Sequence, residues 1–147
     1  MITNKNKRFL AQYGSKEHLD KLVNDKLHYV RSGVAKNPQA SREQLDLLAN
    51  DENSDVRISV AENPSASKEH LDLLANHKGW IVREAVAKNP SASKEHLDKL
   101  MHDEYYYVRS GVAENPSASK EHLDKLANDE DHYVRKVAKE NMKKRFS

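Results

Sequence analysis

Side chains that could do chemistry recur in this sequence at a fixed interval of 26 residues. The first such set is histidine, replaced once by glutamine: His18, Gln44, His70, His96 and His122. Imidazoles suit zinc, but each ligand nitrogen must lie about 2.0–2.1 Å from the metal. Neighbouring packed helices are roughly 8–10 Å apart, so rings on successive helices cannot share one ion. We predict no metal site and place these histidines on a solvated face.

Aspartate and arginine form two further sets at the same interval. The aspartates are Asp20, Asp46, Asp72, Asp98 and Asp124, and the arginines are Arg31, Arg57, Arg83, Arg109 and Arg135. A row of five arginines could bind phosphate groups, because a planar guanidinium matches anionic oxygens. Every arginine, however, has an aspartate at the same period, within reach in its own or the adjacent unit. We therefore expect a structural ladder of salt bridges that joins unit to unit.

Composition and motifs narrow the function classes. The chain has no cysteine, which excludes disulfides, thiolate metal sites and thiol nucleophiles. Its 25 basic and 23 acidic residues leave a formal net charge of +2, which indicates neither a polyanion binder nor an acidic mimic. No glycine-rich phosphate loop or nucleophile elbow occurs. We expect no catalytic residue, no enzyme activity and no cofactor.

The sequence also lacks the signals of a membrane or secreted protein. No apolar run approaches the roughly 18–20 residues of a membrane span. The first residues, MITNKNKRFLAQYG, lack the apolar core of a signal peptide. We expect a cytoplasmic protein with no membrane partner.

The elements that position these side chains are pairs of short helices. In the unit that begins at Ser67, the apolar residues Leu71, Leu74 and Ala75 share one helical face, with Ser67 as the N-cap. We expect this first helix to end at Asn76, since asparagine accepts the left-handed conformation common at helix ends. In the other units the position after this helix end holds aspartate, which we predict to be the N-cap of a second helix. Proline ends that helix at Asn37-Pro38, Asn63-Pro64, Asn89-Pro90 and Asn115-Pro116.

Neither helix is long enough to be stable alone, so neighbouring units must stack to bury their apolar stripes. The predicted fold is an all-α solenoid of about five 26-residue two-helix units in a single domain, residues 1–147. We place an N-terminal cap at 1–14, repeats at 15–40, 41–66, 67–92, 93–118 and 119–141, and a C-terminal cap or tail at 142–147. The asparagine of each Asn-Pro step is expected to bond the backbone between units.

The stretch LDLLANDENSDVRISVAENP, residues 45–64, resembles the variant leucine-rich repeat family. The resemblance extends from about Ser15 to Asn141. It implies a right-handed superhelix similar to HEAT repeats, with no β-sheet and with one helix of each pair, the second, in part 3₁₀. A founding member carries an iron–sulfur domain, for which this chain has no cysteine. The resemblance implies no particular activity.

One segment of each repeat varies while the rest is nearly fixed. The five positions that we expect to open the second helix read DKLHY, DENSD, HKGWI, DEYYY and DEDHY. A fixed frame with one varied strip is what a binding surface requires, and tyrosine and tryptophan give large contact areas at low entropic cost. The predicted partner-binding residues are Leu27, His28, Tyr29, Trp80, Ile81, Tyr105, Tyr106, Tyr107, His132 and Tyr133.

Two readings of this strip remain open. Some rings could instead cover the seam between units, and we expect Tyr107, which precedes Val108, to be partly core. The partner is predicted to be another protein, which the chain serves as adaptor or inhibitor. The alternative is nucleic-acid binding through arginine, lysine and aromatic side chains. We expect a monomer, with self-association through the terminal repeats as a further alternative.

Overall fold

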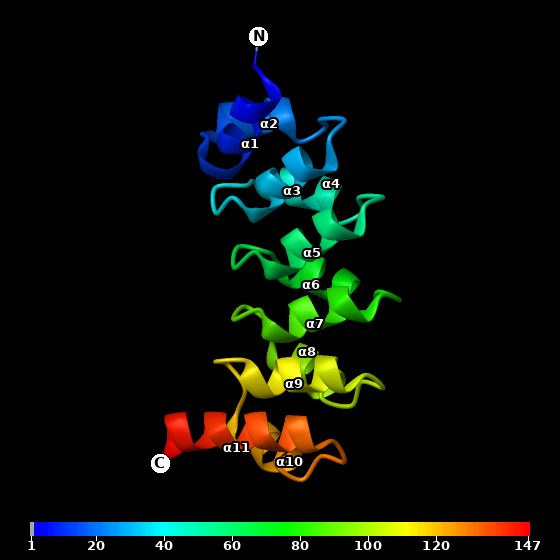
Figure 1. The fold of residues 1–147 in the computed structure, drawn as a ribbon, viewed down its shortest axis with the longest axis vertical. Helices are drawn as coiled ribbons and strands as arrows, with labels where there is room; N and C mark the ends of the chain where they lie inside the picture. The colour runs from blue at the N-terminus through cyan, green and yellow to red at the C-terminus, as the bar shows by residue number, and fades with distance from the viewer. Residues whose placement is uncertain (1) are drawn as a thin grey trace. The chain divides into compact units, whose positions relative to one another are not determined.

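The computed structural model describes residues 2–147, which form eleven α-helices and no strand (Figure 1). The chain divides into two compact units, Met1–Leu74 and Ala75–Ser147. The helices are α1 (Asn4–Tyr13), α2 (Lys16–Leu22), α3 (His28–Lys36), α4 (Arg42–Leu48), α5 (Ser54–Glu62), α6 (Lys68–Ala75), α7 (Trp80–Lys88), α8 (Lys94–Leu100), α9 (Tyr106–Glu114), α10 (Lys120–Leu126) and α11 (His132–Phe146). The predicted all-α helical-repeat fold is confirmed.

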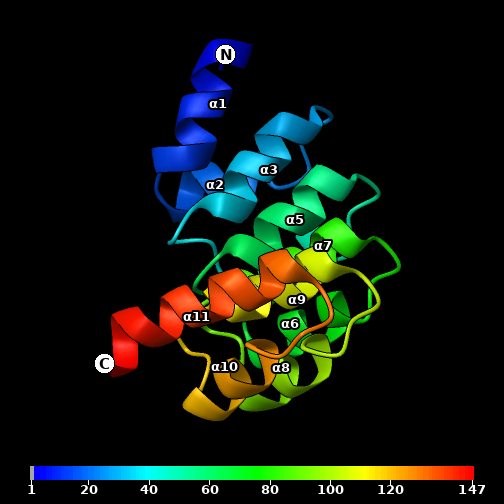
Figure 2. The ribbon, with the colours of Figure 1, turned by 60° about the horizontal axis from the view of Figure 1, so that its bottom comes forward.

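Each repeat contributes a first helix and a second helix. The first helices are α2, α4, α6, α8 and α10, and the second helices are α3, α5, α7, α9 and α11. Second helices pack on one another within each unit: α3 lies between α1 and α5, and α9 lies between α7 and α11 (Figure 2). The N-terminal helix α1 therefore packs on α3 as a preceding second helix would.

The core repeats with the sequence. In the second repeat Leu45 and Leu48 of α4 face Val56 and Val60 of α5, and all four side chains are at most 1 % exposed. In the other repeats the same positions hold leucine and valine, with Ala138 as the one exception, and all are at most 2 % exposed. Burying one such side chain contributes about 1.5–3 kcal/mol, so the stacking of helix pairs supplies the stability that a lone pair lacks.

Small residues on the second helices permit close packing. A Cβ added at Gly33 would lie 2.9 Å from the Cβ of Ala11, and one at Gly111 would lie 3.0 Å from the Cβ of Ala87. Both distances are shorter than ordinary contacts between methyl groups. The glycines thus allow α3 to approach α1, and α9 to approach α7.

Helix ends differ from the prediction in two respects. No residue among 2–147 has a positive φ angle, so the first helices do not end in a left-handed residue at Asn76 or its equivalents. They end in the right-handed conformation, as at Met101, whose N–H donates to the carbonyls of Leu97 and Lys99. The predicted 3₁₀ character of the second helix is also absent, since all the helices described are α-helical.

At the C-terminal end the second helix continues, because the proline that ends it in the other repeats is missing. Position 142 is methionine where other repeats have proline, and α11 runs for 15 residues without a break. At the other end, Phe9 and Tyr13 of α1 do not cover the core. They are instead 63 % and 66 % exposed, while the buried residue of α1 is Ala11.

Candidate functional site

Three of the four repeated histidines are buried and the fourth, His18, is half-buried, which corrects their predicted place on a solvated face. His70, His96 and His122 are at most 5 % exposed, and Gln44 is 3 % exposed. Each is the third residue of a first helix and completes a capping box with the N-cap serine. In the third repeat the backbone N–H of Ser67 donates to Nδ1 of His70 at 3.0 Å.

The opposite edge of these rings bonds the preceding repeat. Nε2 of His70 lies 2.6 Å from Oδ1 of Asp46, and Nε2 of His122 lies 2.7 Å from Oδ1 of Asp98. Because Nδ1 accepts a hydrogen bond, Nε2 carries the ring proton and donates a hydrogen bond to the carboxylate. Gln44 reproduces both bonds, accepting from the N–H of Ser41 and donating to Asp20 at 2.6 Å. Over residues 2–147, no three histidine or acidic side chains meet as a metal site would need.

Arginines form the expected ladder, but with a different set of aspartates. Arg31 makes a two-point bond with Asp51, with Nε 2.7 Å from Oδ2 and Nη2 3.1 Å from Oδ1. Arg83 pairs in the same way with Asp103, and Arg109 with Asp129. The partner is thus the aspartate of the turn in the next repeat, 20 residues ahead, not the predicted aspartate of the first helix.

The predicted aspartates have other roles, and two arginines depart from the pattern. Asp72 pairs with Lys68 of its own helix at 3.2 Å, and Asp124 is exposed. Arg135 donates to the carbonyl of Asp129 at 2.7 Å. Arg57 donates to the carbonyl of Asp51 and to Ser54, but its buried Nε has no hydrogen-bond partner. Position 77, which a spacing of 20 residues would make aspartate, carries histidine.

These ion pairs shift the acid–base properties of their members. Burial acts to raise the pKa of Asp51, but hydrogen bonds from Arg31 and from the backbone of Asn53 outweigh it, so the pKa is lowered. The hydrogen bond to Asp51 raises the pKa of Arg31 against its own desolvation, and Asp129 does the same for Arg109. Because the guanidinium N–H groups of these arginines already bond aspartate, few donors remain to bind a phosphate group.

Asparagines bond the backbone between repeats, as expected. Nδ2 of Asn115 donates to the carbonyls of Ala87 at 2.6 Å and Asn89 at 2.8 Å. Its Oδ1 accepts from the N–H of Ser117 at 2.7 Å. Asn37 and Asn63 repeat this arrangement in the first unit. The repeated polar residues are therefore occupied with holding the scaffold together.

The variable segment straddles the start of the second helix. Its first three residues lie in a turn, in which Asp103 accepts a hydrogen bond from the N–H of Tyr105 at 2.9 Å. The N-cap is the third residue, such as Leu27, Tyr105 or Asp131, and not the aspartate that we predicted. Only the fourth and fifth residues belong to the helix.

In the second unit the variable positions gather four aromatic rings, which we call the aromatic cluster: Trp80, Tyr105, Tyr106 and Tyr107. Trp80 stacks on Tyr107 with ring centroids 5.2 Å apart and on Tyr105 at 6.0 Å. Tyr106 stacks on Tyr107 at 4.2 Å. The guanidinium of Arg83 lies 5.7 Å from the centre of the Tyr105 ring. Stacking holds these rings in fixed positions on the surface.

The cluster is accessible. Tyr105 is 44 % exposed and Tyr107 is 42 % exposed. We expected Tyr107 to be partly core, but the buried residue at this point is its neighbour Val108. Trp80 and Tyr106 are half-buried. The neighbouring Ile81 and Tyr133 are also exposed. These rings do not merely cover a seam between repeats.

A hollow of about 390 Å³ adjoins the cluster and is lined by Tyr106, Tyr107, Asp131, His132 and Tyr133. We call it the tyrosine hollow. Interaction with the hydroxyl of Tyr107, then desolvation and the negative charge of Asp131, raise the pKa of Tyr106 to about 12. The hollow thus brings together four of the predicted partner-binding residues, from α9 and α11, with Asp131 added: Tyr106, Tyr107, His132 and Tyr133.

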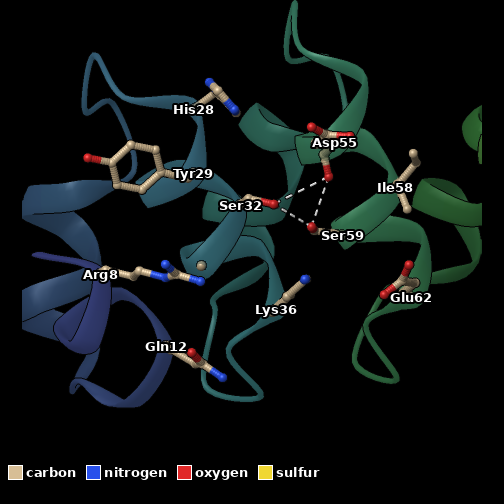
Figure 3. A pocket seen from close by; sticks show the side chains of 11 residues that line it. Arg8, Gln12, His28, Tyr29, Ser32, Lys36, Asp55, Ile58, Ser59 and Glu62 are labelled. Atoms are coloured by element: carbon tan, nitrogen blue, oxygen red, sulfur yellow. Dashed lines mark hydrogen bonds between the residues drawn. The ribbon is translucent and has the colours of Figure 1, made fainter.

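In the first unit the predicted residues border a different hollow, of about 430 Å³ (Figure 3). His28 and Tyr29 lie at one edge, with their rings 6.0 Å apart edge to face, whereas Leu27 is a half-buried N-cap. Arg8 of α1 and Lys36 of α3 make one side of the hollow basic (Figure 3). Asp55 and Glu62 of α5 make the other side acidic (Figure 3).

The floor of this hollow contains residues that sequence reasoning missed. Ser32 and Ser59 join across α3 and α5 with their Oγ atoms 2.6 Å apart, and Ser59 also donates to the carbonyl of Asp55 at 2.8 Å. The sequence does contain a signal for this region, a second position that varies between repeats. It lies four residues after the first residue of each second helix: Ser32, Ile58, Glu84, Ser110 and Lys136. A third follows one turn later: Lys36, Glu62, Lys88, Glu114 and Glu140. Helical spacing places these positions on the same face as the variable aromatic residues.

Comparison with known proteins adds the following. No family model and no curated protein matches this chain. The chain is similar to a solved structure described as a leucine-rich repeat variant with a novel repetitive protein structural motif. The two are 23 % identical with a TM-score of 0.49, over 95 % of this chain and 76 % of the other. Within residues 2–147, no helix is both long and apolar enough to cross a membrane.

Proposed function

We propose that this protein is a non-enzymatic, cytoplasmic protein-binding module, an adaptor or an inhibitor of a larger partner. Its contact surface is the exposed face of the second helices, with the aromatic cluster as its main anchor. One observation carries the proposal. The repeated polar residues bond other parts of the scaffold, whereas the residues that vary between repeats line exposed faces and hollows.

The chemistry of the cluster supports a protein partner. Tryptophan and tyrosine are enriched among the residues that dominate protein interfaces, because each buries a large area with few rotatable bonds. Trp80, Tyr105 and Tyr107 already stack on one another, so little side-chain freedom would be lost on binding. Arg83 and Arg109 are engaged by aspartates, which weighs against the nucleic-acid alternative.

The test is affinity capture from the protein's own cell lysate, with and without nuclease. A triple variant, Trp80→Ala with Tyr105→Ala and Tyr106→Ala, removes the anchor. A control variant, Phe9→Ala with Tyr13→Ala, removes two exposed rings of α1 outside the cluster. We expect a protein that is captured despite nuclease, binds directly once purified, and is lost only with the triple variant. Capture that disappears with nuclease would favour nucleic acid, and equal capture by both variants would refute this surface.

A further inference from the structure

The tyrosine hollow has the composition of a site for a cation. Three tyrosines, Tyr106, Tyr107 and Tyr133, and one carboxylate, Asp131, line it. The faces of aromatic rings carry partial negative charge and attract ammonium and guanidinium groups within about 6 Å. This protein makes such a contact itself, since Arg83 sits 5.7 Å from the centre of Tyr105.

Asp131 can supply a counter-charge without giving up its structural role. As the N-cap of α11, its Oδ1 accepts hydrogen bonds from the N–H groups of Tyr133 at 2.8 Å and Val134 at 3.2 Å. Both bonds use the same oxygen, so Oδ2 keeps its lone pairs for another donor. The residue is half-buried, so its charge is less screened than that of a fully exposed carboxylate.

The surroundings of the hollow hold more free acidic than basic groups, because the nearby cations Lys88 and Arg109 are each paired with a carboxylate. Glu104 and Glu130 are exposed in the turns that precede α9 and α11. Arg109, which joins these two repeats, is paired with Asp129, and its Nη2 also lies 3.6 Å from Oε1 of Glu130. Tyr105 to Tyr107 and His132 to Tyr133 add no permanent positive charge. The region therefore favours a cation, although the whole chain has a formal net charge of +2.

We propose that the tyrosine hollow binds the side-chain cation of a basic, lysine- or arginine-containing segment of the partner protein, with Asp131 as its counter-ion. This inference rests on the proposed protein-binding function and specifies the chemistry of the partner. The ammonium or guanidinium group lies against the rings of Tyr106 and Tyr133, because Tyr107 already stacks on Tyr106 and on Trp80. The flanking basic residues of the segment face Glu104 and Glu130.

Three synthetic 12-residue peptides test this proposal by titration calorimetry. They share a glycine-serine background and carry four lysines, four arginines or four glutamines. Trp80, the single tryptophan of the chain, stacks on Tyr107 and supplies a second readout through its fluorescence. We expect one or both basic peptides to bind and the glutamine peptide to bind at least about tenfold more weakly. The lysine and arginine peptides distinguish the two sources of the cation.

Substitutions locate the site. Tyr133→Ala and Asp131→Asn should each weaken binding of the basic peptide by at least about fivefold, as expected for loss of one cation–π contact or one ion pair. Asparagine is as good an N-cap as aspartate, so Asp131→Asn removes the charge and keeps the helix start. Tyr133→Phe keeps the ring face and should bind nearly as wild type. Tyr29→Ala, at the same repeat position in the first unit, is the matched control.

The outcomes separate this inference from the proposed function. Equal binding of the glutamine peptide, or basic-peptide binding unchanged by both Tyr133→Ala and Asp131→Asn, overturns the cation site. If no basic peptide binds but a captured partner still requires the aromatic cluster, the cation site is wrong and the protein-binding function stands. If neither peptides nor any captured protein require these residues, both proposals fail.

Discussion

Arg109 and Asp129 join two successive repeats by a two-point ion pair, with Nε 2.8 Å from Oδ2 and Nη2 3.1 Å from Oδ1. Both side chains are at most 9 % exposed. The guanidinium also donates to the carbonyl of Asp103 at 2.8 Å, so one residue fixes the turn of its own repeat and the turn of the next. The pair therefore has a structural role, because it holds two successive repeats together.

Loss of one member of this pair should strongly destabilise the protein. Asp129→Ala leaves the guanidinium of Arg109 buried without its counter-ion, which costs about 3 kcal/mol in the free energy of unfolding. Urea denaturation followed by circular dichroism measures this loss. Asp124→Ala is the control, because Asp124 is exposed, and it should change the free energy by less than about 0.5 kcal/mol. Equal effects of the two substitutions would contradict the ladder.

Acid should weaken the ladder through Asp51. Its pKa is lower in the folded chain than the ordinary value of 3.8, so its contribution to stability is complete above that value. The contribution is lost as the pH falls below 3.8 and through the folded pKa. Asp51→Asn should be less stable than wild type at pH 7 and should lose less stability on acidification. Unfolding curves at pH 7 and across pH 4 to 2 measure the difference, and parallel pH profiles would rule out this role for Asp51.

The buried histidines should tolerate glutamine and little else. His70→Gln recreates the arrangement seen at Gln44, and we expect a change below about 0.5 kcal/mol. His70→Leu loses the cap and the bond to Asp46 and should cost about 2 kcal/mol. Thermal unfolding compares the two. His102→Leu, at an exposed histidine, is the control, and a similar cost there would refute the capping role.

Gly111 should accept alanine but no larger residue. An added Cβ would lie 3.0 Å from the Cβ of Ala87 and 3.3 Å from the carbonyl oxygen of Glu84. For Gly111→Ala, the higher helix propensity of alanine, about 1 kcal/mol, offsets the tight contact. Gly111→Leu forces α7 and α9 apart and should cost about 2–3 kcal/mol. Chemical denaturation of both variants tests this, and an equally stable leucine variant would show that the helices are free to separate.

Much of the fold was predictable because it depends on local rules repeated many times. Serine caps, leucine faces and proline stops act within a few residues, and the 26-residue period repeats each of them. Bond partners across repeats were harder to predict. The aspartate sets at Asp46 and Asp51 have the same period, so spacing alone could not decide which of them binds arginine.

The candidate surface was predictable only in part. Variation between repeats identified the residues that open the second helix, including Tyr106 and Tyr107. The sequence also varies one and two helical turns further on, at Ser32 and Lys36, which line the hollow of the first unit. Whether a ring is exposed or buried, as at Tyr107, depends on how neighbouring rings stack, which the sequence pattern does not specify.

Most bonds between repeats run at fixed offsets along the chain, and this has a consequence for how such proteins change. Arg83 meets Asp103 20 residues on, His122 meets Asp98 24 residues back, and Asn115 meets Asn89 26 residues back. A gene segment encoding one 26-residue block therefore carries the side chains that bond the preceding repeat and the groups that the following repeat bonds. Duplicating or deleting such a block would lengthen or shorten the chain by one repeat and leave most of these bonds intact, with the arginine pair missing where histidine replaces aspartate, as at His77. New combinations of recognition residues could then arise by copying whole blocks, without redesign of the framework.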